Sequence, residues 1–248
     1  MKRNPYVAGS FYPSSKEKIL SMFRDFESQL EDIGPLPNIR AIIAPHAGYV
    51  YSGMVAMAAY KAASSSKGKD ITLLGPSHYY GFPDVLQCDF ESWLSPLGET
   101  KCLPFKEIPI SNDPFIPEHS LEVQLPFIQH VFKDIILHPL IVGDLQPGTK
   151  VKEQVDRLAK GLIVASSDLS HFLPYDDAVR KDKNTIGKIL RLEDPDPEEA
   201  CGKEPIKILL YMARKRKWKP KLIIYKNSGD TAGPRDSVVG YSAIAFTE

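Results

Sequence analysis

Three short apolar runs that lack polar alternation constrain the fold of this chain more than any other sequence feature. They span residues 39–44, 71–74 and 162–165, and a fourth run of the same type spans 135–142. Runs of this kind indicate strands that are buried on both faces, as in a sheet covered by helices. The sequence therefore predicts an α/β fold, a three-layer arrangement with a central mixed, mostly parallel sheet flanked by helices.

The segments around these runs predict the covering helices. Ser14 and Glu17 have the spacing of a capping box and should open an amphipathic helix. Pro126 should kink or divide a helical segment at 118–132. Further helices are expected at 52–63, 151–160 and 198–217, the last of them interrupted around Cys201–Gly202 and Pro205. Further strands are expected at 221–225 and 238–246, and hairpins or an edge excursion within 85–110. No repeat or linker divides the chain, so we predict one domain over residues 1–248.

Charge and cysteine content narrow the classes of partner and location. Lys plus Arg number 31 and Asp plus Glu number 31, so no net charge favours nucleic acid or an acidic membrane. The basic run 214–217 is interpreted as the solvated end of a helix, with a phosphate contact as the alternative. Only three cysteines occur, the N-terminus lacks a signal peptide's apolar core, and no apolar run reaches the roughly 20 residues of a membrane span. We therefore expect a cytoplasmic protein without disulfides.

Three of the six histidines directly follow predicted strands. His46, His78 and His171 come just after the runs that end at residues 44, 74 and 165. In α/β sheets, ligands bind outside the carboxyl ends of the strands. Imidazole is the commonest metal ligand in proteins and also a general base near neutral pH. These positions predict a shared site, although any one loop histidine taken alone is more often simply solvated.

Four other residues are candidates for the same site. Asp168 precedes His171 by three residues and could orient an imidazole, bind a metal or accept a proton, or it could cap a helix. His119 and Glu122 are three residues apart, so on a helix they share a face and could project into one pocket. Cys201 lies at the expected helix break, and a thiolate beside two imidazoles suits Zn, Fe or Cu.

Five segments in register resemble the Memo family, and no single one of them would suffice. They are Ala44-Pro45-His46-Ala47-Gly48-Tyr49, Gly75-Pro76-Ser77-His78, Glu118-His119-Ser120-Leu121-Glu122, Ser166-Ser167-Asp168 with His171, and Cys201-Gly202-Lys203-Glu204-Pro205-Ile206. The segments 7–13 and 239–243 match as well, so the resemblance covers nearly the whole chain.

The resemblance implies a fold related to the catalytic subunit of class III extradiol dioxygenases. By this likeness His46 and His78 would be the imidazole ligands, and Cys201 would occupy the place of the carboxylate ligand. His171 would stand in the acid/base position, with Asp168 beside it. His119 and Glu122 would line the same pocket. The implied cofactor is a redox or divalent metal ion, iron or copper first and zinc as a further possibility.

Two functional hypotheses remain open at this point, with metal-dependent hydrolysis as a third. The first is a metal-dependent oxidoreductase, similar to a dioxygenase, that acts on a small molecule. The second is a binding or adaptor protein that uses the same cleft for a peptide or for metal sequestration. Tyr49, with Tyr51, Tyr79 and Tyr80, could form an aromatic wall for such a ligand or could simply pack at the rim. Nucleic acid and membrane partners are not expected, and the sequence makes no prediction of the oligomeric state.

Overall fold

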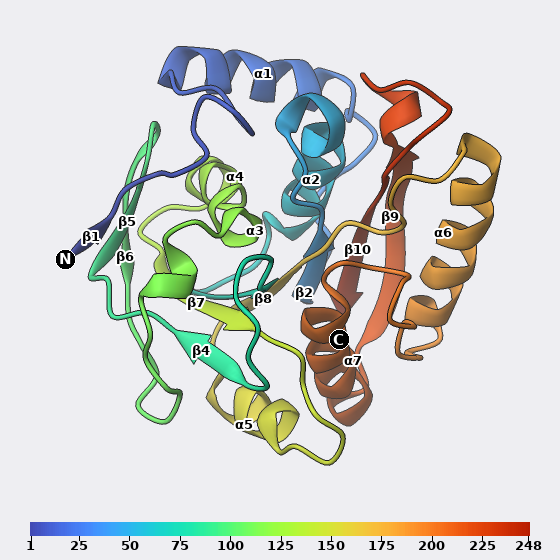
Figure 1. The fold of residues 1–248 in the computed structure, drawn as a ribbon. Coiled ribbons are helices and arrows are strands. Elements are labelled where there is room, and N and C mark those ends of the chain that lie inside the picture. The colour runs from blue at the N-terminus through green and yellow to red at the C-terminus, as the bar shows by residue number, and fades with distance from the viewer.

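A ten-stranded sheet runs through the centre of the computed structural model, which describes residues 1–248 (Figure 1). In chain order the strands are β1 (Lys2–Arg3), β2 (Ile39–Ala44), β3 (Asp70–Pro76), β4 (Val85–Gln87), β5 (Ser92–Ser95), β6 (Gly98–Cys102), β7 (Ile136–Val142), β8 (Leu162–Ser166), β9 (Lys219–Asn227) and β10 (Gly240–Thr247). Across the sheet they follow the order β1-β5-β6-β7-β3-β8-β2-β10-β9, and β4 pairs with β7 outside this path.

The centre of the sheet is parallel and its margins are mixed. Strands β6, β7, β3, β8 and β2, in this order, run parallel to one another. Strands β10 and β9 continue the sheet in antiparallel orientation, and β4, β5 and β6 form antiparallel pairs at the other side. The predicted mixed, mostly parallel sheet is therefore confirmed, and so is the expectation of hairpin-like strands within 85–110.

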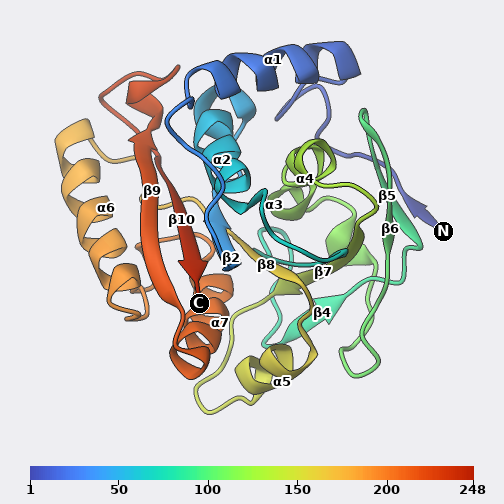
Figure 2. The same ribbon diagram turned by 180° about the vertical axis from the view of Figure 1, so that it is seen from behind.

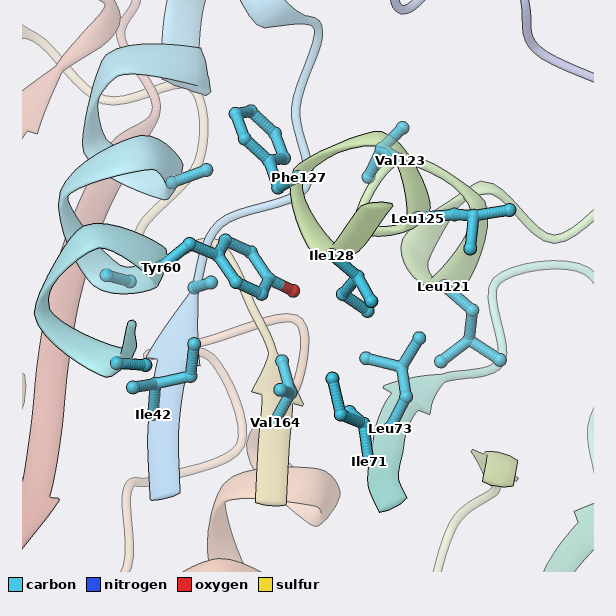
Figure 3. Packing of buried hydrophobic residues seen from close by; sticks show 14 of the residues in the cluster. Ile42, Tyr60, Ile71, Leu73, Leu121, Val123, Leu125, Phe127, Ile128 and Val164 are labelled. Carbon is cyan, nitrogen blue, oxygen red and sulfur yellow. The ribbon is translucent and has the colours of Figure 1, made fainter. Parts of the chain in front are cut away.

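Helices cover both faces of the sheet and complete a three-layer arrangement (Figures 1 and 2). They are α1 (Lys16–Ser28), α2 (Tyr49–Ala63), α3 (His119–Glu122), α4 (Leu125–Val131), α5 (Val151–Leu158), α6 (Tyr175–Leu190) and α7 (Lys203–Arg216). One buried cluster joins α1, α2, α3 and α4 to one face, and a second joins α5, α6 and α7 to the other. In the first cluster, Tyr60, Phe127 and Ile128 pack over Ile42, Ile71, Leu73 and Val164 (Figure 3).

The helix boundaries correct several expectations. Ser15, and not Ser14, caps α1, because its hydroxyl accepts from the amide of Lys18. Helix α6 was not anticipated, because its inward face includes the fully buried carboxylate of Asp182 and its sequence is rich in charge. Pro126 lies in the first turn of α4 and separates it from α3, as expected.

Two further features bear on the sequence predictions. The basic run 214–217 does end a helix, α7, where Lys215 and Arg216 pair with the carboxylate of Asp156. No helix combines the length and apolarity that crossing a membrane requires.

Candidate metal centre

The central parallel strands bring two histidine loops together. Strand β8 lies between β3 and β2, and the register pairs Ala44 with Ser166 and Leu74 with Ala165. All three strands therefore end at the same edge of the sheet. His46 and His78 each stand two residues beyond the end of a strand, and their ring centroids are 5.2 Å apart.

Cys201 reaches this edge from the N-terminal end of α7. Gly202 precedes the helix, and its amide donates to the Ser167 hydroxyl at 3.0 Å. A Cβ atom on Gly202 would lie 2.4 Å from the carbonyl oxygen of Ser166, so only glycine permits this close approach. The approach places Cys201 Sγ 3.2 Å from His46 Nε2, and the amide of Asp168 donates to the sulfur at 3.3 Å.

The ligand atoms of His46, His78 and Cys201 all lie within 4.8 Å of one another. Zinc bonds of about 2.0 Å to nitrogen and 2.3 Å to sulfur, set at a tetrahedral angle, separate those two atoms by about 3.5 Å. The observed 3.2 Å between sulfur and Nε2 is close to that separation, so the residues fit a metal ion with little rearrangement. His46 is 2% exposed, whereas the His78 side chain is 28% exposed, so the pocket opens on the His78 side.

Glu118 holds the imidazole of His78. Its carboxylate accepts from the backbone amide of His78 at 2.7 Å and contacts His78 Nδ1 at 2.9 Å, and it also accepts from the amide of Ser120. Burial opposes the charge on Glu118, but these hydrogen bonds and the charge of His78 outweigh it and lower its pKa to about 2. A carboxylate on Nδ1 leaves Nε2 of His78 free for a metal. No spacing pattern in the sequence indicates this role, because Glu118 directly precedes His119 and lies 40 residues from His78.

The imidazole of His46 has a neutral partner. Its Nδ1 lies 2.9 Å from the Ser166 hydroxyl, and its Nε2 faces the sulfur of Cys201. Burial lowers the pKa of His46 well below its usual value, and the neighbouring His78 adds to the effect. Burial has the opposite effect on the Cys201 thiol, whose pKa it raises, and the carboxylate of Asp168 contributes to this rise. His46 is therefore neutral at physiological pH, which is the form that binds metals.

His119 lines the same pocket. Its ring stacks on His78 with 4.5 Å between centroids and meets His46 edge-on at 5.5 Å, while Phe11 packs against it at 4.6 Å. Burial and the two neighbouring imidazoles lower the pKa of His119 to about 4. Its Nδ1 has no hydrogen-bond partner and lies 3.5 Å from the Glu118 carboxylate.

Glu122 lies away from this pocket, contrary to the prediction that it shares a face with His119. Its side chain is fully buried and pairs with Arg3 at 2.8 Å. The carboxylate also accepts from the amides of Tyr6 and Val7 and from the hydroxyl of Tyr12. Glu122 therefore anchors the N-terminal segment to α3 and does not enter the histidine pocket.

Tyr49 also differs from its predicted place. It is 1% exposed, and its hydroxyl donates to the carbonyl of Val123 at 2.7 Å inside the aromatic core. The other three tyrosines of the predicted aromatic wall, Tyr51, Tyr79 and Tyr80, do face solvent, at 39%, 54% and 45% exposed. Of these, Tyr79 contacts the pocket, with its ring centroid 6.1 Å from that of His119.

Asp168 and His171 occupy different positions in the loop after β8. Asp168 is buried, and its carboxylate accepts from the backbone amide of His46 at 2.8 Å, so it holds the loop that carries this histidine. Burial raises the pKa of Asp168, and the amide of His46 and the charge of His171 oppose the rise. His171 is exposed and packs beside Phe172, which is 75% exposed with a left-handed φ of 58°. No hydrogen bond joins Asp168 to His171.

Comparison with known proteins gives consistent matches over nearly the full length. The family model described as Memo-like protein matches residues 3–245. A MEMO1 family protein from Thermoplasma volcanium is 34% identical, over 98% of this chain and 98% of its own. MEMO1 family proteins from Archaeoglobus fulgidus and Pyrobaculum aerophilum are 33% and 34% identical, each over 98% of this chain.

Proposed function

This chain belongs to the Memo family, and on that premise we propose that it binds one metal ion through His46, His78 and Cys201 and uses it for redox chemistry on a small molecule. The observation that carries the proposal is the convergence of the three ligand atoms within 4.8 Å. Ser166 and Glu118 occupy the Nδ1 atoms of the two imidazoles, which supports binding through Nε2 in both.

The donor set indicates the class of metal. Two imidazoles and a thiolate suit borderline and soft ions, so iron, copper and zinc fit better than magnesium or calcium. Three protein ligands leave a coordination position for water or substrate, which is typical of catalytic and not of structural zinc sites. A bound ion would supply a Lewis acid and, for iron or copper, one-electron chemistry.

The residues around the three ligands have distinct parts in the proposed reaction. His119 is neutral at physiological pH because its pKa is about 4, so it offers a lone pair within the pocket. His171 is exposed and can exchange protons with solvent, which suits an acid/base group. Asp168 keeps His46 in place through its backbone amide. The fold relationship to class III extradiol dioxygenases that the sequence motifs imply is the reason for proposing an oxygen-dependent reaction.

Metal analysis of anaerobically purified protein tests this proposal. We expect near-stoichiometric metal in the wild type and a loss of it in His46→Ala and in Cys201→Ser. His130→Ala and Cys88→Ser are the matched controls, because His130 bonds Glu27 on the surface and Cys88 lies in the core. A wild type that neither contains nor binds added iron, copper or zinc would refute the proposal. Metal-dependent oxygen uptake with candidate small molecules then tests the redox step.

A ligand-binding role is the second candidate, and the exposed aromatic residues favour it. Tyr79 and Phe172 are 54% and 75% exposed and adjoin the rings of His119 and His171. Exposed aromatic rings beside a pocket suit a peptide or a ring-shaped ligand. Affinity for such a ligand that survives metal removal would support this role, and strict metal dependence would count against it.

A further inference from the structure

We propose that Tyr60, Gln124 and Ser166 form a hydrogen-bonded chain that holds His46 as its Nδ1–H tautomer, with the Nε2 lone pair directed at the metal pocket. The inference deepens the proposed function. Its statement about metal binding rests on that function, whereas its statement about the tautomer does not. Tyr60 belongs to α2, Gln124 to the junction of α3 and α4, and Ser166 to the end of β8. All three residues are completely buried, so water cannot replace a missing partner.

The contact between His46 Nδ1 and the Ser166 hydroxyl is ambiguous by itself. The two atoms are 2.9 Å apart, and a hydroxyl can either donate to the ring or accept from it. If Ser166 donated, Nδ1 would be unprotonated and the ring proton would sit on Nε2. In that tautomer Nε2 cannot bind a metal. The direction of this one hydrogen bond therefore decides whether His46 is ready to act as a ligand.

The other partners of Ser166 resolve the direction. Its hydroxyl donates to the carbonyl of Ser120 at 2.6 Å, and a carbonyl oxygen can only accept. The same hydroxyl accepts from Nε2 of Gln124 at 2.8 Å. The single hydroxyl proton is thus committed to Ser120, and only an oxygen lone pair remains for His46. Nδ1 must then carry the ring proton.

The carbonyl of Pro45 fixes the orientation of the Gln124 amide, and the hydroxyl of Tyr60 complements that orientation. The Tyr60 hydroxyl donates to Gln124 Oε1 at 2.9 Å, while Gln124 Nε2 donates to the carbonyl of Pro45 at 2.9 Å. A flipped amide would turn Oε1 toward the Pro45 carbonyl, where two acceptors would repel each other. Figure 3 shows the Tyr60 side chain extending from α2 over the sheet, with its oxygen directed away from the helix.

The two imidazole ligands are therefore oriented by different chemistry. His78 has a carboxylate on Nδ1, which accepts under all conditions in which it is ionised. His46 has a hydroxyl, which acts as an acceptor because its proton goes to the carbonyl of Ser120, while Gln124 and Tyr60 hold that hydroxyl in place. The three residues are positioning residues for His46, and none of them contacts the pocket in which the metal would lie.

The test begins with nitrogen-15 NMR of the His46 ring in metal-free protein. We expect the wild type to carry the proton on Nδ1, and Ser166→Ala to raise the population with the proton on Nε2. Gln124→Met leaves the Ser120 carbonyl to accept the hydroxyl proton but removes a donor that holds Ser166 in place, so it should shift the population in the same direction by a smaller amount. Tyr60→Phe keeps the aromatic ring in the core and should change the tautomer population of His46 least.

Metal affinity provides the second measurement, with Zn²⁺ as the probe and a competing chelator. Removing a residue that orients a metal ligand typically lowers affinity about 10–100-fold, and we expect this range for Ser166→Ala. Gln129→Met is the matched control for Gln124→Met, because Gln129 lies on α4 but bonds Gly98 and Thr100 away from the site. In this control variant, the tautomer population of His46 and the affinity for Zn²⁺ should equal those of the wild type.

Two results would overturn the inference. One is a wild-type His46 that carries its proton on Nε2, and the other is a Ser166→Ala protein with unchanged tautomer populations. Both are measured without metal, so they remain decisive even if the wild type binds no zinc and the proposed function fails. Circular dichroism of each variant shows whether it is folded, and Tyr60→Phe and Gln124→Met remain informative if Ser166→Ala is not.

Discussion

Replacing Glu122 with Gln should destabilise the fold strongly and leave zinc affinity nearly unchanged. Glu122 forms an ion pair with Arg3 in which the two side chains are 0% and 2% exposed. The guanidinium also donates to the carbonyls of Phe115 and Glu118, so it cannot swing out to water without loss. A neutral amide at position 122 would therefore leave a buried positive charge without a counterion.

The magnitude follows from the burial of this pair. Removing one partner of a buried ion pair costs about 3–5 kcal/mol, because the remaining charge stays desolvated. Gln has nearly the volume of Glu, so no cavity adds to the loss. The amide also presents a donor toward the amides of Tyr6 and Val7 and the hydroxyl of Tyr12, all of which donate. We therefore expect the upper part of that range.

Urea unfolding measures the effect, with circular dichroism for the whole chain and tryptophan fluorescence for the N-terminal region. Trp93 is a suitable local probe, because the Arg3 guanidinium lies 4.4 Å from its ring centroid. Arg3→Met and the double variant complete a double-mutant cycle that isolates the pair. Glu99→Gln is the control, since its pair with Lys2 is exposed and its loss should leave the free energy of unfolding nearly unchanged.

Two outcomes would refute the reasoning. A loss of less than about 1 kcal/mol in Glu122→Gln would mean that the Arg3 charge is not held in the interior as the structure has it. A fall in zinc affinity with little loss of stability would instead restore Glu122 to the metal pocket.

Three further predictions concern the site itself. Glu118→Gln should lower zinc affinity about 10–100-fold by competition titration, because the carboxylate that orients His78 is lost, and an unchanged affinity would exclude that role. Metal-free wild type should lose roughly 3 kcal/mol more stability in urea than His119→Phe as the pH falls from 6.5 to 4. The reason is that His119 in the folded protein stays neutral down to its pKa of about 4, whereas the same histidine in the unfolded chain becomes protonated from about pH 6.5. Equal losses in the two proteins would contradict this. Gly202→Ala should lower both the melting temperature and zinc affinity, because its Cβ would lie 2.4 Å from the carbonyl of Ser166, and wild-type values would show that the approach can relax.

The sequence by itself determined the sheet and the rim on which the site lies. The run 39–44 is the strand β2 with the same bounds, and the runs ending at residues 74 and 165 extend by only one or two residues in β3 and β8. These elements are local, since apolar periodicity and turn residues act over a few positions. Because the strands are parallel neighbours, the residues that follow them had to share one edge, which brings His46 and His78 together.

Only the tertiary structure decided which residues near that edge of the sheet belong to the candidate metal site. His119 and Glu122 have a spacing that suits one helix face, yet Glu118 turns toward His78 while Glu122 pairs with Arg3, more than a hundred residues away in the chain. The orientation of His46 depends on partners at positions 60, 124 and 166, which no local pattern connects. Hydrogen bonds between buried groups are fixed by how distant elements pack, and that packing is a property of the whole fold.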